Sequence, residues 1–201
     1  MLAMECAVAW ATEAKRFPGI NSLLRGLILD GTFCDAKTYI TTQWRDRLGT
    51  YPTFTQNLLK RLTQEERFEC KAYKALEQSL TDVFSVRVIP HPLCYEESDK
   101  GCNEAIYVQM QGASEFCCGG VLANWTIKER LHVVQVPTLV VRGEYDTMTE
   151  EASQEVVDAI KTAWPLVMVP RAAHCKLIDE PQLCCDIFVR FLSTCDATRG
   201  R

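Results

Sequence analysis

The sequence predicts an α/β fold, with parallel sheet strands, flanking helices and an inserted helical lid. The first observation is that the last third alternates strand, helix, strand and helix patterns, which is typical of a parallel sheet covered by helices. The second is a short buried strand pattern near residue 27, and the third is the helical texture of residues 35–130. We therefore expect a core over 1–34 and 131–201, and a lid over 35–130 that covers the carboxyl edge of the sheet.

The amino-terminal segment predicts a buried helix. Residues 2–11 are dense in good helix formers and contain hardly a polar side chain. No Ser, Thr, Asp, Asn or Gly stands ahead of them to cap the helix, so we expect the chain to begin in the middle of an architecture. Pro18-Gly19 interrupts the pattern, and residues 24–31 predict a short buried strand closed by glycine.

The stretch from 35 to 130 predicts several helices. Thr63-Gln64-Glu65-Glu66 has the form of a capping box, so an amphipathic helix is expected to begin there. Its inward stripe consists of Phe68, Ala72, Leu76, Leu80 and Val83. Two prolines and the polar residues 96–100 should interrupt it, and shorter helices should continue to Leu131.

The last third predicts two strand and helix units. Residues 136–143 and 166–169 are apolar runs of strand length, and residues 150–163 and 181–192 have helical spacing. Pro181 suits the first turn of a helix. The last helix should turn an apolar stripe inward, formed by Leu183, Ile187, Phe188, Phe191 and Leu192.

Composition excludes several classes of protein. The chain has 201 residues, of which 47% are hydrophobic and 24% charged, an ordinary balance for one packed domain. Its net charge of -4 argues against a nucleic-acid partner. No apolar run approaches the ~20 residues of a membrane helix, and the start lacks the features of a signal peptide. We therefore expect a soluble cytoplasmic protein with no nucleic-acid and no membrane partner.

Cysteine is abundant for such a compartment. The chain has 11 cysteines but no C-x-x-C pair, so the spacing does not predict a zinc knuckle or a thioredoxin-like site. Adjacent cysteines point to different sides of a strand or helix and cannot easily bind one metal. We expect most of them to be small buried hydrophobic residues, and we expect no metal and no cofactor.

Two polar residues follow the two strands of the last third. In parallel sheets, reacting groups lie on loops at the carboxyl ends of strands; Asp146 follows the first of these strands and His174 the second. A carboxylate fixes the tautomer of a histidine and stabilises the imidazolium that forms when a serine gives up its proton. Singly, Asp146 could form a turn and His174 could be a surface or core histidine. Together, at consecutive strand ends, they favour the acid and base of a serine hydrolase.

Five segments extend this pattern over residues 104 to 195. They are Met110-Gln111-Gly112-Ala113-Ser114-Glu115-Phe116, Asn124-Trp125 with Arg130-Leu131, Val136-Pro137-Thr138-Leu139-Val140, Gly143-Glu144-Tyr145-Asp146, and Ala173-His174 with Asp179-Glu180-Pro181. In order and spacing they resemble M-x-G-P-N-E-F, D-W…R-L, V-P-T-L, G-x-Y-D and S-H…E-E-P of the proline iminopeptidase (prolyl aminopeptidase) family. His91-Pro92-Leu93-Cys94 is a looser match to its H-x-C. The resemblance implies the carboxyl-terminal portion of an α/β-hydrolase fold.

The amino end resembles the family too, and departs from it. In the family a nucleophile elbow, G-x-S-x-G-G, runs into a helix of the form M-L-A-M-E-Y-A, which Met1-Leu2-Ala3-Met4-Glu5-Cys6-Ala7 resembles. We therefore expect the serine, the first part of the sheet and part of the oxyanion hole to be missing. A nucleophile elbow requires small residues two positions before and two positions after the nucleophile, and neither Ser114 nor Cys118 has both. The same holds for Ser22, Ser79, Ser85, Ser98, Ser153 and Ser193.

The resemblance implies release of an amino-terminal residue, proline by preference, from a small peptide or amide through an acyl-enzyme, without cofactor or metal. Glu115 falls where the family has a lid glutamate that binds the free amine, although it could be a solvated helix residue. A second family glutamate is Thr147 here, so a related esterase or amidase stays open.

Other hypotheses and residues stay open beside this one. The chain could be a non-catalytic remnant that acts as an interaction module, or an incomplete copy of an active enzyme, with self-association through an exposed sheet edge in either case. We expect His91 to be a lid or supporting residue, His132 a solvated helix end and Cys175 a packing residue.

Overall fold

The computed structural model describes residues 1–13, 16, 23–116 and 118–197. Its described part contains a parallel sheet of three strands in the order β1-β2-β3, formed by β1 (Leu27–Asp30), β2 (Thr138–Gly143) and β3 (Val167–Val169). Leu27 pairs with Thr138, and Val141 with Val167. All three strands run in one direction, so their carboxyl ends meet at one edge of the sheet.

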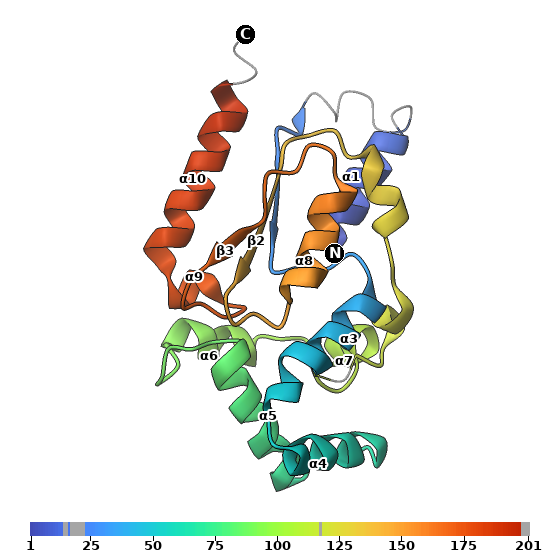
Figure 1. Ribbon diagram of the computed structural model, residues 1–201, viewed down its shortest axis with the longest axis vertical. Helices are drawn as coiled ribbons and strands as arrows, with labels where there is room; N and C mark the ends of the chain where they lie inside the picture. Colours follow the sequence, from blue (N-terminus) through green and yellow to red (C-terminus); the bar gives the residue numbers. More distant parts are fainter. Residues whose placement is uncertain (14–15, 17–22, 117, 198–201) are drawn as a thin grey trace.

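Helices cover both faces of the sheet (Figure 1). α1 (Leu2–Thr12) and α8 (Glu150–Ala159) pack on one face, where Val140 is buried among their apolar side chains. α10 (Pro181–Ala197) packs on the other face, where Val141 contacts the cluster around Phe191. Because successive strand residues point to opposite faces and both faces are covered, β2 is buried at every position, including its apolar run Leu139–Val141.

Residues 35–130 are helical, as expected, and most of these helices lie beyond the carboxyl ends of the strands (Figure 1). The α-helices are α3 (Ala36–Asp46), α4 (Thr53–Gln64), α5 (Lys71–Phe84), α6 (Leu93–Lys100) and α7 (Glu104–Gln111). Short 3-10 helices are η1 (Leu48–Thr50), η2 (Val121–Asn124) and η3 (Lys128–Val133). α4 and α5 bury their own apolar cluster, which includes Leu62 and Leu80.

The predicted elements of the sheet region are confirmed, with shifted ends. α8 stops at Ala159 rather than 163, and α10 continues to Ala197 rather than ending at 192. The short helix α9 (Lys176–Asp179) precedes α10 and was not expected. Leu192 is wrong as an inward residue, because it is 50% exposed. Cys184, Phe191 and Cys195 are the buried positions of α10 instead.

The predicted capping box is wrong. Residues 63 and 64 end α4, and Glu66 has a positive φ of 54° that stops a helix. The next helix, α5, begins only at Lys71, where the Cys70 sulfur accepts a hydrogen bond from the main chain of Tyr73. Ala72 is accordingly exposed and Tyr73 takes its place in the core. A local motif cannot distinguish a helix start from a helix end when the apolar periodicity continues past a turn.

Two further expectations about residues 90–130 and the cysteines are wrong. The polar residues 96–100 do not interrupt a helix but form most of α6, which has no buried residue and is therefore free to carry charges. Most described cysteines are not buried; the fully buried ones are Cys34, Cys184 and Cys195. Cys94, Cys102 and Cys185 are exposed, because they lie on outward surfaces of the helical parts.

α1 is confirmed as a helix without a side-chain cap, but it is only partly buried. Met4, Ala7 and Val8 face the sheet, whereas Leu2 is 77% exposed. Pro18-Gly19 lies outside the described residues. Within the described part, no helix has the length and apolar character needed to cross a bilayer.

Candidate active site

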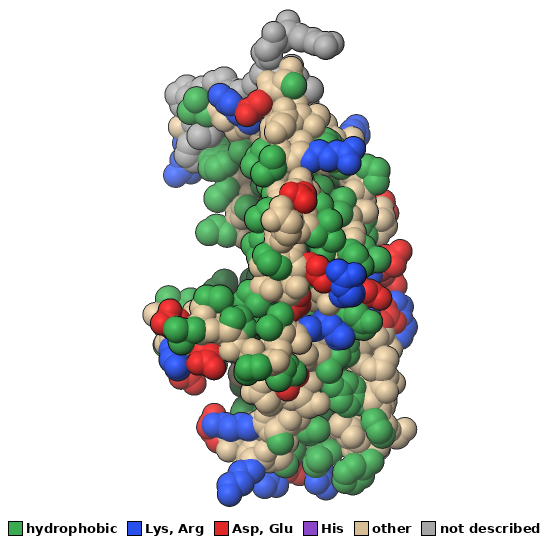
Figure 2. Space-filling model, turned by 90° about the vertical axis from the view of Figure 1, so that its left-hand side faces the viewer, with side chains coloured by type: hydrophobic (Ala, Val, Ile, Leu, Met, Phe, Trp, Pro, Cys, Tyr) green, Lys and Arg blue, Asp and Glu red, His purple; other side chains and the backbone are tan. Residues whose placement is uncertain are grey.

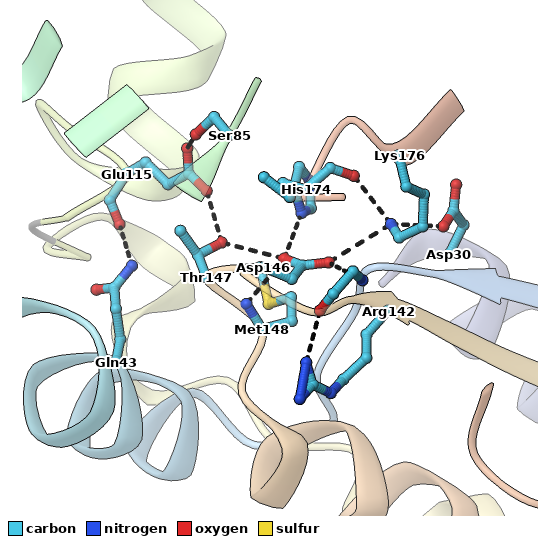
Figure 3. A network of polar contacts seen from close by, with 12 residues as sticks. Asp30, Gln43, Ser85, Glu115, Arg142, Asp146, Thr147, Met148, His174 and Lys176 are labelled. Carbon is cyan, nitrogen blue, oxygen red and sulfur yellow. Dashed lines mark hydrogen bonds and ion pairs between the residues drawn. The ribbon is translucent and has the colours of Figure 1, made fainter. Parts of the chain in front are cut away.

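Asp146 and His174 lie side by side at the carboxyl edge of the sheet. Asp146 follows β2, His174 follows β3, and the Asp146 Oδ1 to His174 Nδ1 distance is 2.9 Å (Figure 3). The two loops are joined by main-chain hydrogen bonds, including one from Tyr145 N to the Ala172 carbonyl at 2.9 Å. A side chain at Gly143 would collide with the carbonyl groups of Ala172 and Ala173, so glycine is required for this approach.

The Asp146 carboxylate is fully buried and well satisfied. Its Oδ1 accepts a hydrogen bond from Met148 N at 2.9 Å, and its Oδ2 accepts one from Gly143 N at 3.3 Å. Burial alone would favour the neutral acid. The charge and hydrogen bond of His174, together with the ammonium group of Lys176, outweigh burial and lower the pKa of Asp146 to about 2. Asp146 is therefore ionised at neutral pH.

His174 is held by main chain and by a glycine. Its amide N donates to the Phe84 carbonyl at 3.1 Å, which ties the loop to the end of α5. Gly31, with φ +56°, lies so close that an added Cβ would be 2.8 Å from the ring carbon Cε1. Burial lowers the pKa of the imidazole, but the charge and hydrogen bond of Asp146, with a contribution from Glu115, raise it to about 9.

Two side chains brace these loops from other segments. Asp179 accepts hydrogen bonds from the main-chain N of Ala173 at 2.8 Å and of Arg87 at 2.8 Å, so it joins the histidine loop to the segment after α5. Arg47 Nε donates to the Asp146 carbonyl at 2.7 Å. The helical segment therefore fixes the position of both loops.

Glu115 belongs to the same polar network. Its carboxylate accepts hydrogen bonds from the Thr147 hydroxyl at 3.0 Å and from the Ser85 hydroxyl at 3.3 Å (Figure 3). Thr147 also lies within 3.5 Å of Asp146 Oδ1, so one hydroxyl stands between the two acids. The structure thus brings Glu115 into the neighbourhood of Asp146 and His174, as expected for a shared site.

An open cleft of about 520 Å³ gives access to this network. His174 and Glu115 both line it, so the imidazole and the carboxylate face one space. The outer side of β1 and the start of α1 form one wall, and α7 forms another. The remaining lining residues are Met1, Ala3, Ile28, Leu29, Asp30, Gly31, Thr32, Phe33, Tyr39, Tyr107, Gln111 and Met148.

Of the other residues considered from the sequence, Ser85 belongs to the network through Glu115. Ser114 is buried and its hydroxyl accepts a hydrogen bond from Phe116 N, and Ser153 is buried in α8. Throughout the described ranges, no serine hydroxyl is hydrogen-bonded to His174; Ser22 lies outside those ranges. Cys175 donates its main-chain N to the Ser85 carbonyl at 2.7 Å.

The remaining histidines are placed as expected. His91 lies in the helical segment, 3.3 Å from Asp82 and against the Tyr95 ring. His132 is exposed near the end of η3. In the part of the chain that the structure describes, no three His, Cys, Asp or Glu side chains are grouped to bind a metal ion.

Sequence reasoning missed Lys176 and its partner Asp30. Lys176 is buried, and its ammonium group lies 2.7 Å from Asp30 Oδ1 and 3.5 Å from Asp146 Oδ2. A lysine two residues after a histidine carries no periodic signal, and a charged residue is normally expected at the surface. Only the folded arrangement of three strand ends reveals it.

Comparison with known proteins finds relatives of one name. No protein-family profile matches the sequence. A proline iminopeptidase from Flavobacterium johnsoniae is 35% identical over 96 residues, which are 48% of this chain and 32% of that protein. A proline iminopeptidase from Elizabethkingia meningoseptica is 25% identical over 187 residues, which are 86% of this chain and 58% of that protein.

Solved structures give the same fold. The crystal structure of proline iminopeptidase from Mycobacterium smegmatis superposes with a TM-score of 0.84 and 25% identity, over 99% of this chain and 63% of that one. The structure of VinJ gives a TM-score of 0.82 at 21% identity, over 94% of this chain and 62% of that one. The chain therefore spans less than two thirds of the length of each of these relatives.

Proposed function

We propose that this chain, which has an α/β-hydrolase fold and curated relatives named proline iminopeptidase, supplies the acid and base of a serine hydrolase that releases amino-terminal residues, proline by preference. The observation that carries the proposal is the 2.9 Å contact between Asp146 Oδ1 and His174 Nδ1 at consecutive strand ends. A buried, ionised carboxylate on one ring nitrogen leaves the other nitrogen, Nε2, to accept a proton in the neutral form of the ring, whose share rises as the pH approaches 9.

In this mechanism the serine hydroxyl attacks the carbonyl carbon of the substrate while His174 Nε2 takes the hydroxyl proton. Asp146 holds the Nδ1–H tautomer and stabilises the imidazolium that forms. The same proton then passes from His174 to the nitrogen of the departing amine, as its bond to the carbonyl carbon breaks. Water then attacks the carbonyl carbon of the acyl-enzyme while His174 takes one of its protons, and His174 returns that proton to the serine oxygen as the ester bond breaks and the amino-terminal residue is released.

Glu115 is proposed to bind the free amine of the substrate. Its carboxylate lines the cleft together with His174, and hydroxyls of Ser85 and Thr147 fix its two oxygens. A carboxylate paired with an ammonium group in a partly desolvated cleft favours substrates with an unblocked amine. Residues 35–130 would act as the lid, because Glu115 and the Phe84 carbonyl that holds His174 both come from them.

We infer that the nucleophile is not among the residues of this chain. The sequence contains no G-x-S-x-G segment. The purified chain should therefore have no serine-hydrolase activity of its own, and labelling by a serine-directed fluorophosphonate would refute this inference.

Activity is tested on a restored version, meaning a version that carries a G-x-S-x-G-G segment and the preceding strands ahead of Met1. The restored version should hydrolyse a prolyl arylamide and should react with the fluorophosphonate. A restored version that melts cooperatively but does neither would contradict the proposal. Turnover of an ester or an N-acetylated amide in place of the free amine would instead favour the related esterase or amidase.

The outer edge of β1 favours a second candidate function, a non-catalytic interaction module. Leu27 N donates to the Pro137 carbonyl just before β2, and Gly31 N donates to the Val141 carbonyl of β2. By the alternation of a parallel strand, the main-chain groups of Ile28 and Asp30 therefore point to the other edge. Exposed Leu2 lies on the neighbouring α1. Such an edge beside apolar surface promotes pairing with another chain, so we expect self-association. A monodisperse monomer in size-exclusion chromatography with light scattering would contradict this expectation.

A further inference from the structure

Lys176 is a buried cation in the polar network that no step above uses. Its side chain is only 1% exposed, although it belongs to the short surface helix α9. A buried ammonium group is strongly unfavourable unless it is paired and hydrogen-bonded. Three oxygens meet this need: Asp30 Oδ1 at 2.7 Å, the His174 carbonyl at 2.9 Å and Asp146 Oδ2 at 3.5 Å.

These three partners come from the carboxyl ends of all three strands. Asp30 is the last residue of β1, Asp146 follows β2, and His174 follows β3. Figure 3 shows the Lys176 side chain pointing toward Asp30 and Asp146, beside His174. The ammonium group thus contacts Oδ2 of Asp146, while Oδ1 faces the ring of His174.

We propose that Lys176 is a positioning residue that joins the end of β1 to the Asp146–His174 pair and holds the carboxylate and the imidazole in their mutual orientation. The inference rests on the proposed function of that pair. An apolar residue in the same space could not form an ion pair with Asp30 or Asp146. Gly31, directly after Asp30, lies against the imidazole, so a contact that fixes the end of β1 also fixes the surface on which the ring rests.

Lys176 also adjusts the charge that His174 experiences. The charged and titratable groups that surround His174 and its carboxylate partner include the acids Asp146, Glu115, Asp30 and Asp179, the cations Lys176, Arg47 and Arg142, and the neutral groups Cys175 and Tyr39. Within this set Lys176 lowers the pKa of His174, against the raising effect of Asp146 and Glu115. Without the ammonium group, the imidazole would keep its proton to still higher pH, so a smaller fraction of it would be neutral and able to act as a base at any given pH.

The experiment is an NMR pH titration of the histidine ring signals in the chain itself, which needs no activity. The chain has 3 histidines, so substituting each in turn assigns the signals. Lys176→Met should shift the protonation equilibrium of His174 about tenfold toward the imidazolium, because a nearby positive charge is removed. Asp30→Asn should shift it about threefold the other way, because a negative charge that partly neutralises Lys176 is removed.

Lys71→Met is the matched control. It removes the same charge from an exposed site at the start of α5 and should leave the His174 titration unchanged. Equal shifts in Lys176→Met and Lys71→Met, or no opposite shift in Asp30→Asn, would overturn the proposal. If Lys176→Met fails to fold, the titration of Asp30→Asn alone tests the proposal, because the Asp30 carboxylate is partly exposed and the fold should survive its removal.

In the restored version, Lys176→Met should move the acid limb of the kcat/KM profile to higher pH by the same factor, whereas a purely structural role would lower the rate without moving the limb. Failure of the proposed function would leave the restored version inactive with its titration shifts intact, so the two failures are distinguishable.

Discussion

The strand region and the helical segment of residues 35–130 differ in how they are buried. Every residue of β2 is buried. Phe191 of α10 packs on one face of the sheet, and α1 packs on the other. By contrast, α6 and α7 have no buried residue. Figure 2, which views the molecule from the α10 side, shows its outline indented between these two parts. The central strand is therefore buried throughout, whereas α6 and α7 are held by fewer buried side chains than α4 and α5, which share a core of their own.

The site divides along the same line. The paired acid and histidine come from strand ends in the strand region, and the carboxylate proposed for amine binding comes from the helical segment. Chemical groups gain most from rigid positioning, whereas groups that select substrates lie commonly on mobile connections. Changes in the first region should therefore affect turnover and stability, and changes in the second should affect selectivity.

The largest effect is expected at Asp146. In the restored version, Asp146→Asn should lower kcat by about 10³ to 10⁴-fold, because the neutral amide holds the wrong tautomer of His174. The measurement is steady-state hydrolysis of a prolyl arylamide. Asp158→Asn, an exposed change on α8, is the control and should retain full activity. A loss of less than about tenfold in Asp146→Asn would mean that the carboxylate does not orient the base.

Stability provides the next contrast between the regions. Phe191→Ala should lower the free energy of unfolding by about 3–5 kcal/mol, because it leaves a cavity beside the sheet. Ile106→Ala on α7, where the side chain is 59% exposed, should change it by at most about 0.5 kcal/mol. Urea denaturation of both variants measures the difference. Similar losses in the two would show that α7 is packed as tightly as α10.

The elements of the strand region could be predicted from the sequence because buried strands and helices show continuous or periodic runs of apolar residues. β2, β3, α8 and α10 were found at nearly their true positions. In the helical segment, amphipathic patterns cross turns, so the start of α5 was misplaced and the polar helix α6 was not recognised. Charged residues on fully exposed helices carry no core periodicity.

The candidate site was predictable only in part. Asp146 and His174 could be found because parallel strands bring their carboxyl ends together. The supporting contacts of Arg47, Asp179 and Lys176 could not be, because they join segments far apart in the chain and depend on where each loop turns. Long-range polar pairs leave no local signal.

A smaller effect is expected at Glu115. In the restored version, Glu115→Gln should reduce the preference for a free amine over its N-acetylated counterpart, by about 1.5–3 kcal/mol in transition-state free energy, because one charged contact is lost. Turnover of the two prolyl arylamides measures the preference. Glu104→Gln is the control, because it removes the same charge at the exposed start of α7, away from the cleft. Equal preference in Glu115→Gln and the unchanged restored version would refute the amine-binding role.

The smallest effect concerns the pH dependence of stability. The pKa of His174 is raised from 6.5 to about 9 in the folded chain, so its contribution to stability is present below about pH 6.5 and is lost as the pH rises toward 9. The urea midpoint of His174→Gln should therefore lie further below that of the unchanged chain at pH 6 than at pH 9.5. His132→Gln, at an exposed site, should show no such difference. A constant gap for His174→Gln would contradict the charged pairing with Asp146.

The central claim is that His174 acts as the base of a serine hydrolase with Asp146 orienting it. Its most direct test is hydrolysis of a prolyl arylamide by the restored version and by the same protein with His174→Ala. The account predicts measurable turnover in the first and a loss of at least about 10³-fold in the second, because a serine hydroxyl is a poor nucleophile without its base. Turnover that survives His174→Ala within about tenfold would contradict it.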